Sequence, residues 1–213
     1  MAYMGLGMVH VRQGNAPAAV PVLEAGLQAC HTFGLTALTF HGIAASLGAA
    51  YALTNRIAEA IPLLRHVAEQ AASMKLVSDH LLGAIPLGEV LLATGHIEEA
   101  KQLGTRALDL ARRHGQRGHE AHALRLLGEV EALGIAAEAE AAKAHYADAI
   151  NLAERLGMRP LAAHCHLDFG KLYRRADNLD RAREHLSTAM TLYREMDMRF
   201  YLEQAETESK ALS

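Results

Sequence analysis

Histidine is the residue type through which this chain could most readily do chemistry. The sequence holds thirteen histidines, and an imidazole can act as a general base or as a metal ligand. His164, Cys165 and His166 stand together, yet adjacent positions on a helix point in different directions. His119 and His122 share a helix face, but the spacing places no third ligand beside them. We therefore predict no metal site.

Catalysis is not expected either. The sequence contains no Cys-x-x-Cys, no His-Glu-x-x-His and no glycine-rich loop ending in Lys-Ser or Lys-Thr, which are the local signatures of redox, zinc and nucleotide chemistry. Cys165 has no base that spacing alone would bring to it. The sequence predicts a protein that is not an enzyme and that uses no cofactor.

The elements that carry these residues follow from a repeat. Five glycines, each preceded by Leu or Phe, recur at intervals of 41, 40, 40 and 42 residues: Gly7, Gly48, Gly88, Gly128 and Gly170. In four of these units an alanine follows twelve residues later, at Ala19, Ala60, Ala100 and Ala182. A small residue lets a second helix approach closely, and such a period is typical of stacked helical repeats.

The cassette resembles the tetratricopeptide repeat, whose first helix carries a Leu-Gly pair and an aromatic residue, as in Leu47, Gly48 and Tyr51. The resemblance implies an all-α fold, a right-handed α-solenoid of about five helix-turn-helix units of ~40 residues with a C-terminal capping helix. We expect one domain over 1–213, with repeats at 1–34, 35–75, 76–115, 116–157 and 158–197 and the capping helix at 198–211.

Composition limits the partners. The formal net charge is −3 and 51% of the residues are hydrophobic, which gives no general reason to expect binding to nucleic acid or to a membrane surface. No apolar run approaches the ~20 residues that span a bilayer. The two cysteines, Cys30 and Cys165, are too far apart in the array to pair and are expected to be buried thiols. A cytoplasmic location is predicted.

The segment 152–206, with Leu172-Tyr173-Arg174-Arg175 and a later Tyr193-Arg194-Glu195-Met196, is similar to the C-terminal repeat array of bacterial nucleotide cyclase and signal-transduction ATPase proteins. This resemblance implies a non-catalytic protein–protein interaction scaffold, the regulatory part of a larger bacterial signalling protein, which binds a peptide or partner domain in a concave groove. The alternative is a small-molecule effector-sensing domain of a transcriptional regulator or signalling ATPase.

Projecting the first helix of each repeat from its glycine selects the residues of the inner face. Toward the C-terminus these are polar: Arg125, Glu129, His164, Lys171 and Arg174. Arginine and lysine bind carboxylates, so the expected partner is a protein or peptide with an acidic segment. Pairing of these cations with Glu129 and Asp168 would leave the face merely solvated, and both interpretations stay open at this point.

The first repeat suggests a second contact. Residues 1–12 are already amphipathic, and Met4 and Met8 are expected to form an apolar stripe that no preceding repeat covers. Exposed apolar stripes of this kind promote association. We therefore predict a homodimer formed through the N-terminal repeat.

Overall fold

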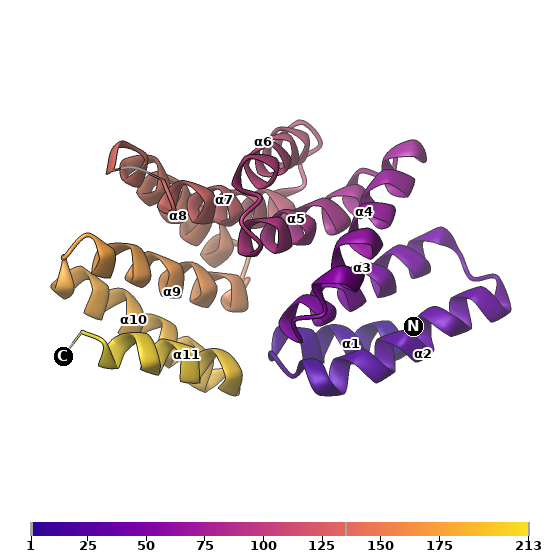
Figure 1. Ribbon diagram of the computed structural model, residues 1–213, viewed down its shortest axis with the longest axis horizontal. Helices are drawn as coiled ribbons and strands as arrows, with labels where there is room; N and C mark the ends of the chain where they lie inside the picture. Colours follow the sequence, from indigo (N-terminus) through magenta and orange to yellow (C-terminus); the bar gives the residue numbers. More distant parts are fainter. Residues whose placement is uncertain (1, 135, 213) are drawn as a thin grey trace. The chain divides into compact units, whose positions relative to one another are not determined.

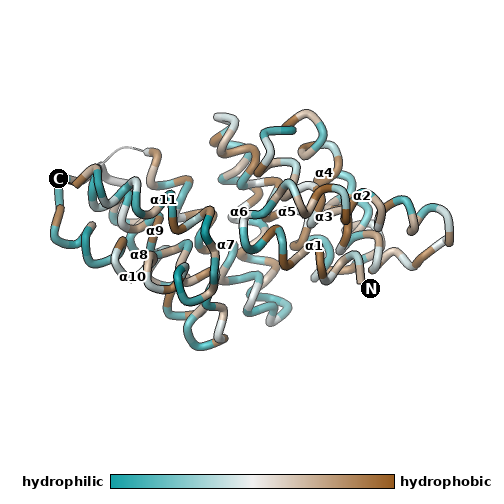
Figure 2. The backbone as a smooth tube through the Cα atoms, turned by 90° about the horizontal axis from the view of Figure 1, so that it is seen from below, coloured by the Kyte–Doolittle hydropathy of each residue, from teal (hydrophilic) through white to brown (hydrophobic). Residues whose placement is uncertain are grey.

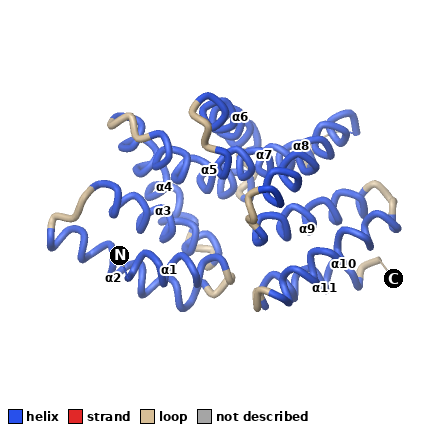
Figure 3. Tube along the Cα trace, turned by 180° about the vertical axis from the view of Figure 1, so that it is seen from behind, coloured by secondary structure: helices blue, strands red, loops and turns tan. Residues whose placement is uncertain are grey.

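The computed structural model describes residues 2–134 and 136–212, apart from the side chains of 136–138. Within these residues the chain forms eleven α-helices and no β-strand (Figure 1, Figure 3). In chain order the helices are α1 (Ala2–Arg12), α2 (Ala16–Phe33), α3 (Ala37–Leu53), α4 (Ile57–Ser73), α5 (Val77–Ala93), α6 (Ile97–Arg113), α7 (Arg117–Ala132), α8 (Ala136–Arg155), α9 (Arg159–Arg175), α10 (Leu179–Glu195) and α11 (Arg199–Lys210). The all-α fold class is confirmed.

Successive helices form the expected hairpins. Helices α1 and α2, α3 and α4, α5 and α6, and α9 and α10 pack directly on one another, and α11 packs on α10. Helices α7 and α8 occupy the corresponding places of the fourth repeat. Hydrophobic and hydrophilic stretches alternate along the helices (Figure 2), as expected where each helix buries one side. Among the described residues, no helix is both long and apolar enough to cross a membrane.

Gly7, Gly48, Gly128 and Gly170 lie where the two helices of a hairpin cross. A Cβ atom placed on Gly48 of α3 would lie 2.5 Å from Leu64 Cγ of α4. One placed on Gly128 of α7 would lie 2.8 Å from Tyr146 Cε1 of α8. Both distances are shorter than the ~3.5–4.0 Å at which nonbonded carbon atoms attract. Glycine is therefore what permits these helices to approach so closely.

The turns between helices repeat a single backbone device. A residue with positive φ follows helices α1 to α6 and α8 to α10, and these residues are Gly14, Gly34, Asn55, Lys75, Gly95, Gly115, Gly157, Asp177 and Asp197. The left-handed conformation directs the chain away from the helix axis and satisfies the last carbonyl groups of the helix. Four of these nine positions are not glycine, so those turns keep a steric cost.

The chain divides into two compact units, Met1–His119 and Glu120–Ser213. In the first unit α1 packs on α3, and α3 packs on α5. Helix α2 contacts α3, and α4 contacts α5, so each hairpin stacks on the next. The core of this unit consists of fully buried aliphatic side chains, among them Leu23, Ile43, Leu47, Leu64, Leu81 and Leu87. The single domain predicted over 1–213 stays a prediction.

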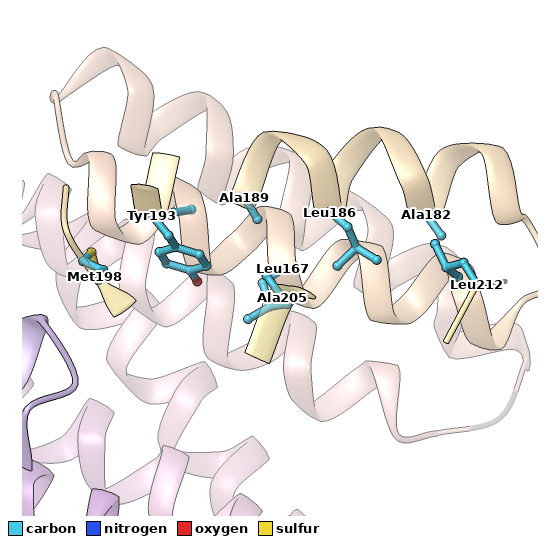
Figure 4. Close-up of a cluster of buried hydrophobic side chains, with 9 residues drawn as sticks. Leu167, Ala182, Leu186, Ala189, Tyr193, Met198, Ala205 and Leu212 are labelled. Atoms are coloured by element: carbon cyan, nitrogen blue, oxygen red, sulfur yellow. The ribbon is translucent and has the colours of Figure 1, made fainter. Parts of the chain in front are cut away.

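The second unit has a continuous core over α9, α10 and α11 (Figure 4). Its buried members are Ala163, Leu167, Ala182, Leu186, Ala189, Tyr193, Met198, Ala205 and Leu212. Ala205 is the buried residue of α11, whereas Glu203 and Gln204 beside it are exposed. An apolar inner side and a polar outer side are what a terminal helix of a repeat array requires.

Helix α1 differs from the expectation. Met4 and Met8 are partly buried, and Met4 packs on α3, where a Cβ atom on Gly42 would lie 2.6 Å from its sulfur. The exposed large hydrophobic side chains of α1 are instead Tyr3, Leu6 and Val9, which are 46%, 51% and 50% exposed. Helix α1 contacts α2 with one side and α3 with another, so only a third side remains exposed. The spacing from Gly7 identifies the side that meets α2, but it does not distinguish the other two.

Candidate functional site

All five predicted site residues belong to the second unit, on helices α7 and α9. Together with residues of α9 and α11 that contact them they form what we call the α7–α9–α11 face. Its members are Arg125, Glu129, His164, Asp168, Lys171, Arg174, Tyr201 and Glu208. The repeat explains their convergence, because successive first helices of the repeats lie side by side.

Arg125 of α7 is held by carboxylates on two helices. Its Nε donates a hydrogen bond to Asp168 Oδ2 of α9 at 2.9 Å, and its Nη2 donates to Glu129 Oε1 at 2.5 Å. The Arg125 side chain is 17% exposed. A guanidinium with this geometry links α7 to α9 by hydrogen bonds. Arg125 therefore has a structural role in the face.

Asp168 is the buried centre of this network. Besides accepting from Arg125, its Oδ1 lies 3.5 Å from Lys171 Nζ, one turn further along α9. Burial alone would raise the pKa of the Asp168 carboxyl, but the charges of Arg125 and Lys171 outweigh burial and hold that pKa below its usual value. Asp168 is therefore ionised at neutral pH, and it compensates the two cations beside it.

His164 lies two turns before Lys171 on α9 and contacts two tyrosines. Its Nδ1 is hydrogen-bonded to the hydroxyl of Tyr193 at 2.7 Å, and its ring meets the Tyr201 ring edge-on with centroids 4.5 Å apart. Burial, with the positive charge of Arg125, lowers the pKa of His164 to about 3. The imidazole is thus neutral at pH 7, where it offers an aromatic and hydrogen-bonding surface without charge.

Lys171 and Arg174 are held less firmly than Arg125. Lys171 pairs with Asp168 at 3.5 Å, which is long for a charged hydrogen bond. Arg174 Nη2 lies 3.0 Å from Glu208 Oε2 of α11. Arg174 Nε is buried and makes no hydrogen bond within the described part of the chain, so an outside carboxylate would meet the terminal nitrogens of the guanidinium. The side chains of Lys171 and Arg174 are 34% and 37% exposed. These two cations retain the capacity to bind a carboxylate from outside.

Several members of the face were not selected from the sequence. Tyr201 and Glu208 lie on α11, and Tyr193, which is bonded to His164 from outside the face, lies on α10. The usable signal was confined to α9, where Asp168 follows His164 by four residues and precedes Lys171 by three, which places all three on one side of the helix. Spacing within one helix cannot show which residues of the next helix face them.

Other polar groups of the chain serve packing. His41 of α3 is fully buried, with Nδ1 2.8 Å from Asp79 Oδ2 of α5 and Nε2 3.0 Å from Gln70 Oε1 of α4. It joins three helices and is closed to solvent. Cys165 is a buried free thiol whose pKa is raised by burial, which makes it unreactive. No cluster of three or more His, Cys, Asp or Glu side chains suited to a metal ion occurs among the described residues.

Comparison with known proteins supports the fold alone. No protein-family model and no curated protein sequence matches the chain. The crystal structure of BtubC (BKLC) from P. vanneervenii is similar, with a TM-score of 0.66 and 15% identity over 96% of this chain and 82% of that one. A putative kinesin light chain of Podosopora anserina with nearly identical TPR-like repeats has a TM-score of 0.56 and 14% identity over 91% of this chain and 94% of its own. A single-residue variant of that protein gives the same TM-score and identity. The chain thus has the fold of tetratricopeptide-like helical repeat proteins.

Proposed function

We propose that this chain is a non-catalytic protein-interaction scaffold that binds an extended peptide segment, or a segment of a partner domain, on the α7–α9–α11 face. The observation that supports it is the contrast between Arg125, which is 17% exposed and paired with two carboxylates, and the more exposed Lys171 and Arg174, which each pair with one. Arg125 already has its hydrogen-bond partners, whereas Lys171 and Arg174 are partly exposed and each has a single carboxylate partner among the described residues. Repeat folds of this type present such faces to other proteins.

The chemistry of the face favours an acidic segment in the partner. Lys171 and Arg174 are three residues apart, hence about one turn of α9, and one carboxylate can contact both cations. Arginine suits a bidentate carboxylate contact, and lysine adds a point charge. Glu208 must then share Arg174 with the ligand. Next to them, the neutral His164 and the Tyr201 ring form a surface for an apolar or aromatic side chain of the same segment.

The remaining predicted residues have supporting roles in this proposal. Arg125 and Glu129 hold each other and, through Asp168, hold α9 against α7. Their contribution to binding is to keep Lys171 in place. A partner that displaced Asp168 from Arg125 would leave a poorly solvated charge, which is costly. We therefore assign contact to Lys171, Arg174 and His164 and positioning to Arg125 and Glu129.

The wider setting follows the resemblance of the segment 152–206 and is part of the same proposal. It places the chain in the cytoplasm, as the regulatory part of a larger bacterial signalling protein. The buried thiols Cys30 and Cys165 agree with a reducing compartment. Affinity capture with the full-length parent protein, followed by identification of its partners, tests this setting independently of the face.

Peptide display tests the face without requiring the partner itself. A library of displayed twelve-residue peptides is selected on the wild-type chain, and the selected peptides are measured against Lys171→Glu/Arg174→Glu. We expect the peptides to be enriched in Asp and Glu and to bind the double variant about tenfold or more weakly, with a larger loss at low salt than at high salt.

A matched control makes the same change of charge elsewhere in the second unit. Arg155→Glu/Arg181→Glu alters exposed residues of α8 and α10, and it should leave peptide affinity nearly unchanged. If the selected peptides bind Lys171→Glu/Arg174→Glu as tightly as the wild type, the face proposed here is not the binding site. Selection of peptides without acidic residues would overturn the proposed ligand chemistry while leaving the scaffold function standing.

A further inference from the structure

Two histidines that the sequence does not bring together meet on the other side of α9. His166 of α9 and His185 of α10 have their Nδ1 atoms 2.9 Å apart. Their ring centroids are 5.1 Å apart and the ring planes are inclined by 37°. The rings are thus nearly end to end, as in a hydrogen bond between two neutral imidazoles. This pair takes no part in the α7–α9–α11 face.

Aromatic contacts fix one member of the pair. The His185 ring lies 4.4 Å from the Phe169 ring and 5.5 Å from the Tyr173 ring, measured between centroids. Phe169 and Tyr173 are themselves stacked at 4.8 Å. His166 stands on the same helix as both aromatic residues, three residues before Phe169. Because α9 and α10 pack along their length, the two imidazoles come from a rigid support, which lowers the entropy cost of a shared ligand.

The surroundings keep both rings in the state that binds metal ions. Burial lowers the pKa of His166, and burial together with the charge of His166 lowers the pKa of His185 to about 4. Both imidazoles are therefore neutral at pH 7, and neutral imidazole is the metal ligand. The carboxylates of Glu154 and Glu184 raise the pKa of His166, but burial outweighs them. The charge of Arg181 lowers the pKa of His185 further.

We infer that His166 and His185 form a two-imidazole site for a divalent first-row transition-metal ion, of the class of Ni²⁺, Cu²⁺ or Zn²⁺. Imidazole nitrogen suits these ions. Two metal–nitrogen bonds of about 2.0–2.1 Å set the nitrogens about 2.9 Å apart at a right angle and about 3.4 Å apart at a tetrahedral angle. The two Nδ1 atoms, which their hydrogen bond now holds 2.9 Å apart, are therefore already close to the separation that an ion requires once the rings have turned.

Binding needs only a side-chain rotation. In the hydrogen-bonded pair the two lone pairs do not converge on one point. Because aromatic contacts hold the His185 ring, the larger rotation falls to His166, about the soft bond between its Cβ and its ring, and it turns both Nδ1 lone pairs toward one ion. The proton that lies between the rings moves to Nε2 of the same imidazole, so each ring stays neutral and no net proton is released. Both residues are partly exposed, so water completes the coordination, in keeping with the absence of a third protein ligand within the described residues.

The test is calorimetric titration of the untagged chain with NiCl2, and with ZnCl2, at pH 7. We expect one ion to bind per chain, and His166→Gln or His185→Gln to weaken binding about 100-fold, because the second imidazole then no longer acts as a preorganised ligand. His114→Gln, which removes an exposed histidine of the first unit, is the control and should bind as the wild type does.

A second readout guards against misfolding of the variants. Without metal, both glutamine variants should keep the helical circular dichroism spectrum of the wild type. With excess Ni²⁺ the melting temperature should rise for the wild type and for His114→Gln, but not for His166→Gln or His185→Gln. The inference is overturned if the two folded glutamine variants bind Ni²⁺ and Zn²⁺ as tightly as the wild type does, or if the wild type binds neither ion. Neither result bears on the proposal that the α7–α9–α11 face binds a peptide.

Discussion

Replacing Gly48 with alanine tests the principle on which the repeat is built. A Cβ atom at this position would lie 2.5 Å from Leu64 Cγ and 2.7 Å from Leu64 Cδ2. Leu64 is fully buried, and a close-packed interior leaves it no free volume into which to move. The added methyl group must therefore separate α3 from α4 or force Leu64 out of its rotamer.

The magnitude follows from two opposing effects. Overpacking of this kind costs about 1–3 kcal/mol, whereas alanine is better than glycine inside a helix by about 1 kcal/mol. Gly5 of α1 isolates the second effect, because a Cβ atom placed there meets no atom within 4 Å. Gly5→Ala should stabilise the chain by up to about 1 kcal/mol. The difference between the two variants then gives the overpacking cost by itself.

Chemical denaturation followed by far-ultraviolet circular dichroism measures both changes, with the slope of the transition as a check that the unfolding process is the same. We expect the midpoint to fall for Gly48→Ala and to rise for Gly5→Ala. Adding Leu64→Ala to Gly48→Ala should cost less than Leu64→Ala alone, with a coupling of about 0.5–3 kcal/mol. If Gly48→Ala stabilises the chain as much as Gly5→Ala does, the α3–α4 crossing is not tight and the reasoning fails.

Three further changes test other parts of the structure. Lys75 has a φ of 57°, and Lys75→Gly should raise the free energy of unfolding by about 0.5 kcal/mol. The reason is that relief of the left-handed strain exceeds the entropy that glycine adds to the unfolded chain. A lowered denaturation midpoint would contradict this. Leu6→Glu/Val9→Glu should convert a dimer into a monomer of unchanged helicity in light-scattering measurements, and a wild-type chain that is monomeric at high concentration would refute the dimer. Asp168→Ala should destabilise the second unit by about 3 kcal/mol, because Arg125 loses a buried partner. The pKa of Asp168 is lower in the folded chain than in the unfolded chain. Its contribution to the free energy of unfolding is therefore present above the unfolded pKa of about 3.9 and is lost as the pH falls through the folded pKa. Asp168→Asn should consequently show a weaker dependence of stability on pH in acid.

The repeat made the fold accessible from the sequence. Glycine spacing and the turn residues are local signals, and the expected repeats 76–115 and 158–197 enclose the helix pairs α5–α6 and α9–α10. Met4 and Met8 show where local signals stop. The period indicates that α1 crosses α2 at Gly7, but it does not indicate which other side of α1 meets α3, and Met4 lies on that side.

The same limit applies to charged residues and to the histidine pair. Helical spacing placed Arg125 and Lys171 on inner sides of their helices, and the structure brings both to Asp168. The convergence of His166 with His185 depends on how α9 and α10 are rotated about their axes, which packing determines. A 19-residue separation across a turn carries no periodic signal that would reveal it.

The number of partners each cation has within the chain decides which one can serve a ligand. Arg125 is 17% exposed and bonded to two carboxylates, so a ligand would have to replace interactions that already satisfy it and would gain little. Lys171 and Arg174 are about twice as exposed, and each has one carboxylate partner among the described residues. For them a carboxylate from a partner adds hydrogen bonds that the folded chain does not make. Arg125, the cation with the most partners inside the chain, is therefore the one least able to bind a ligand. The residues of the face that can bind one, Lys171 and Arg174, lie one and two turns beyond Asp168 on α9.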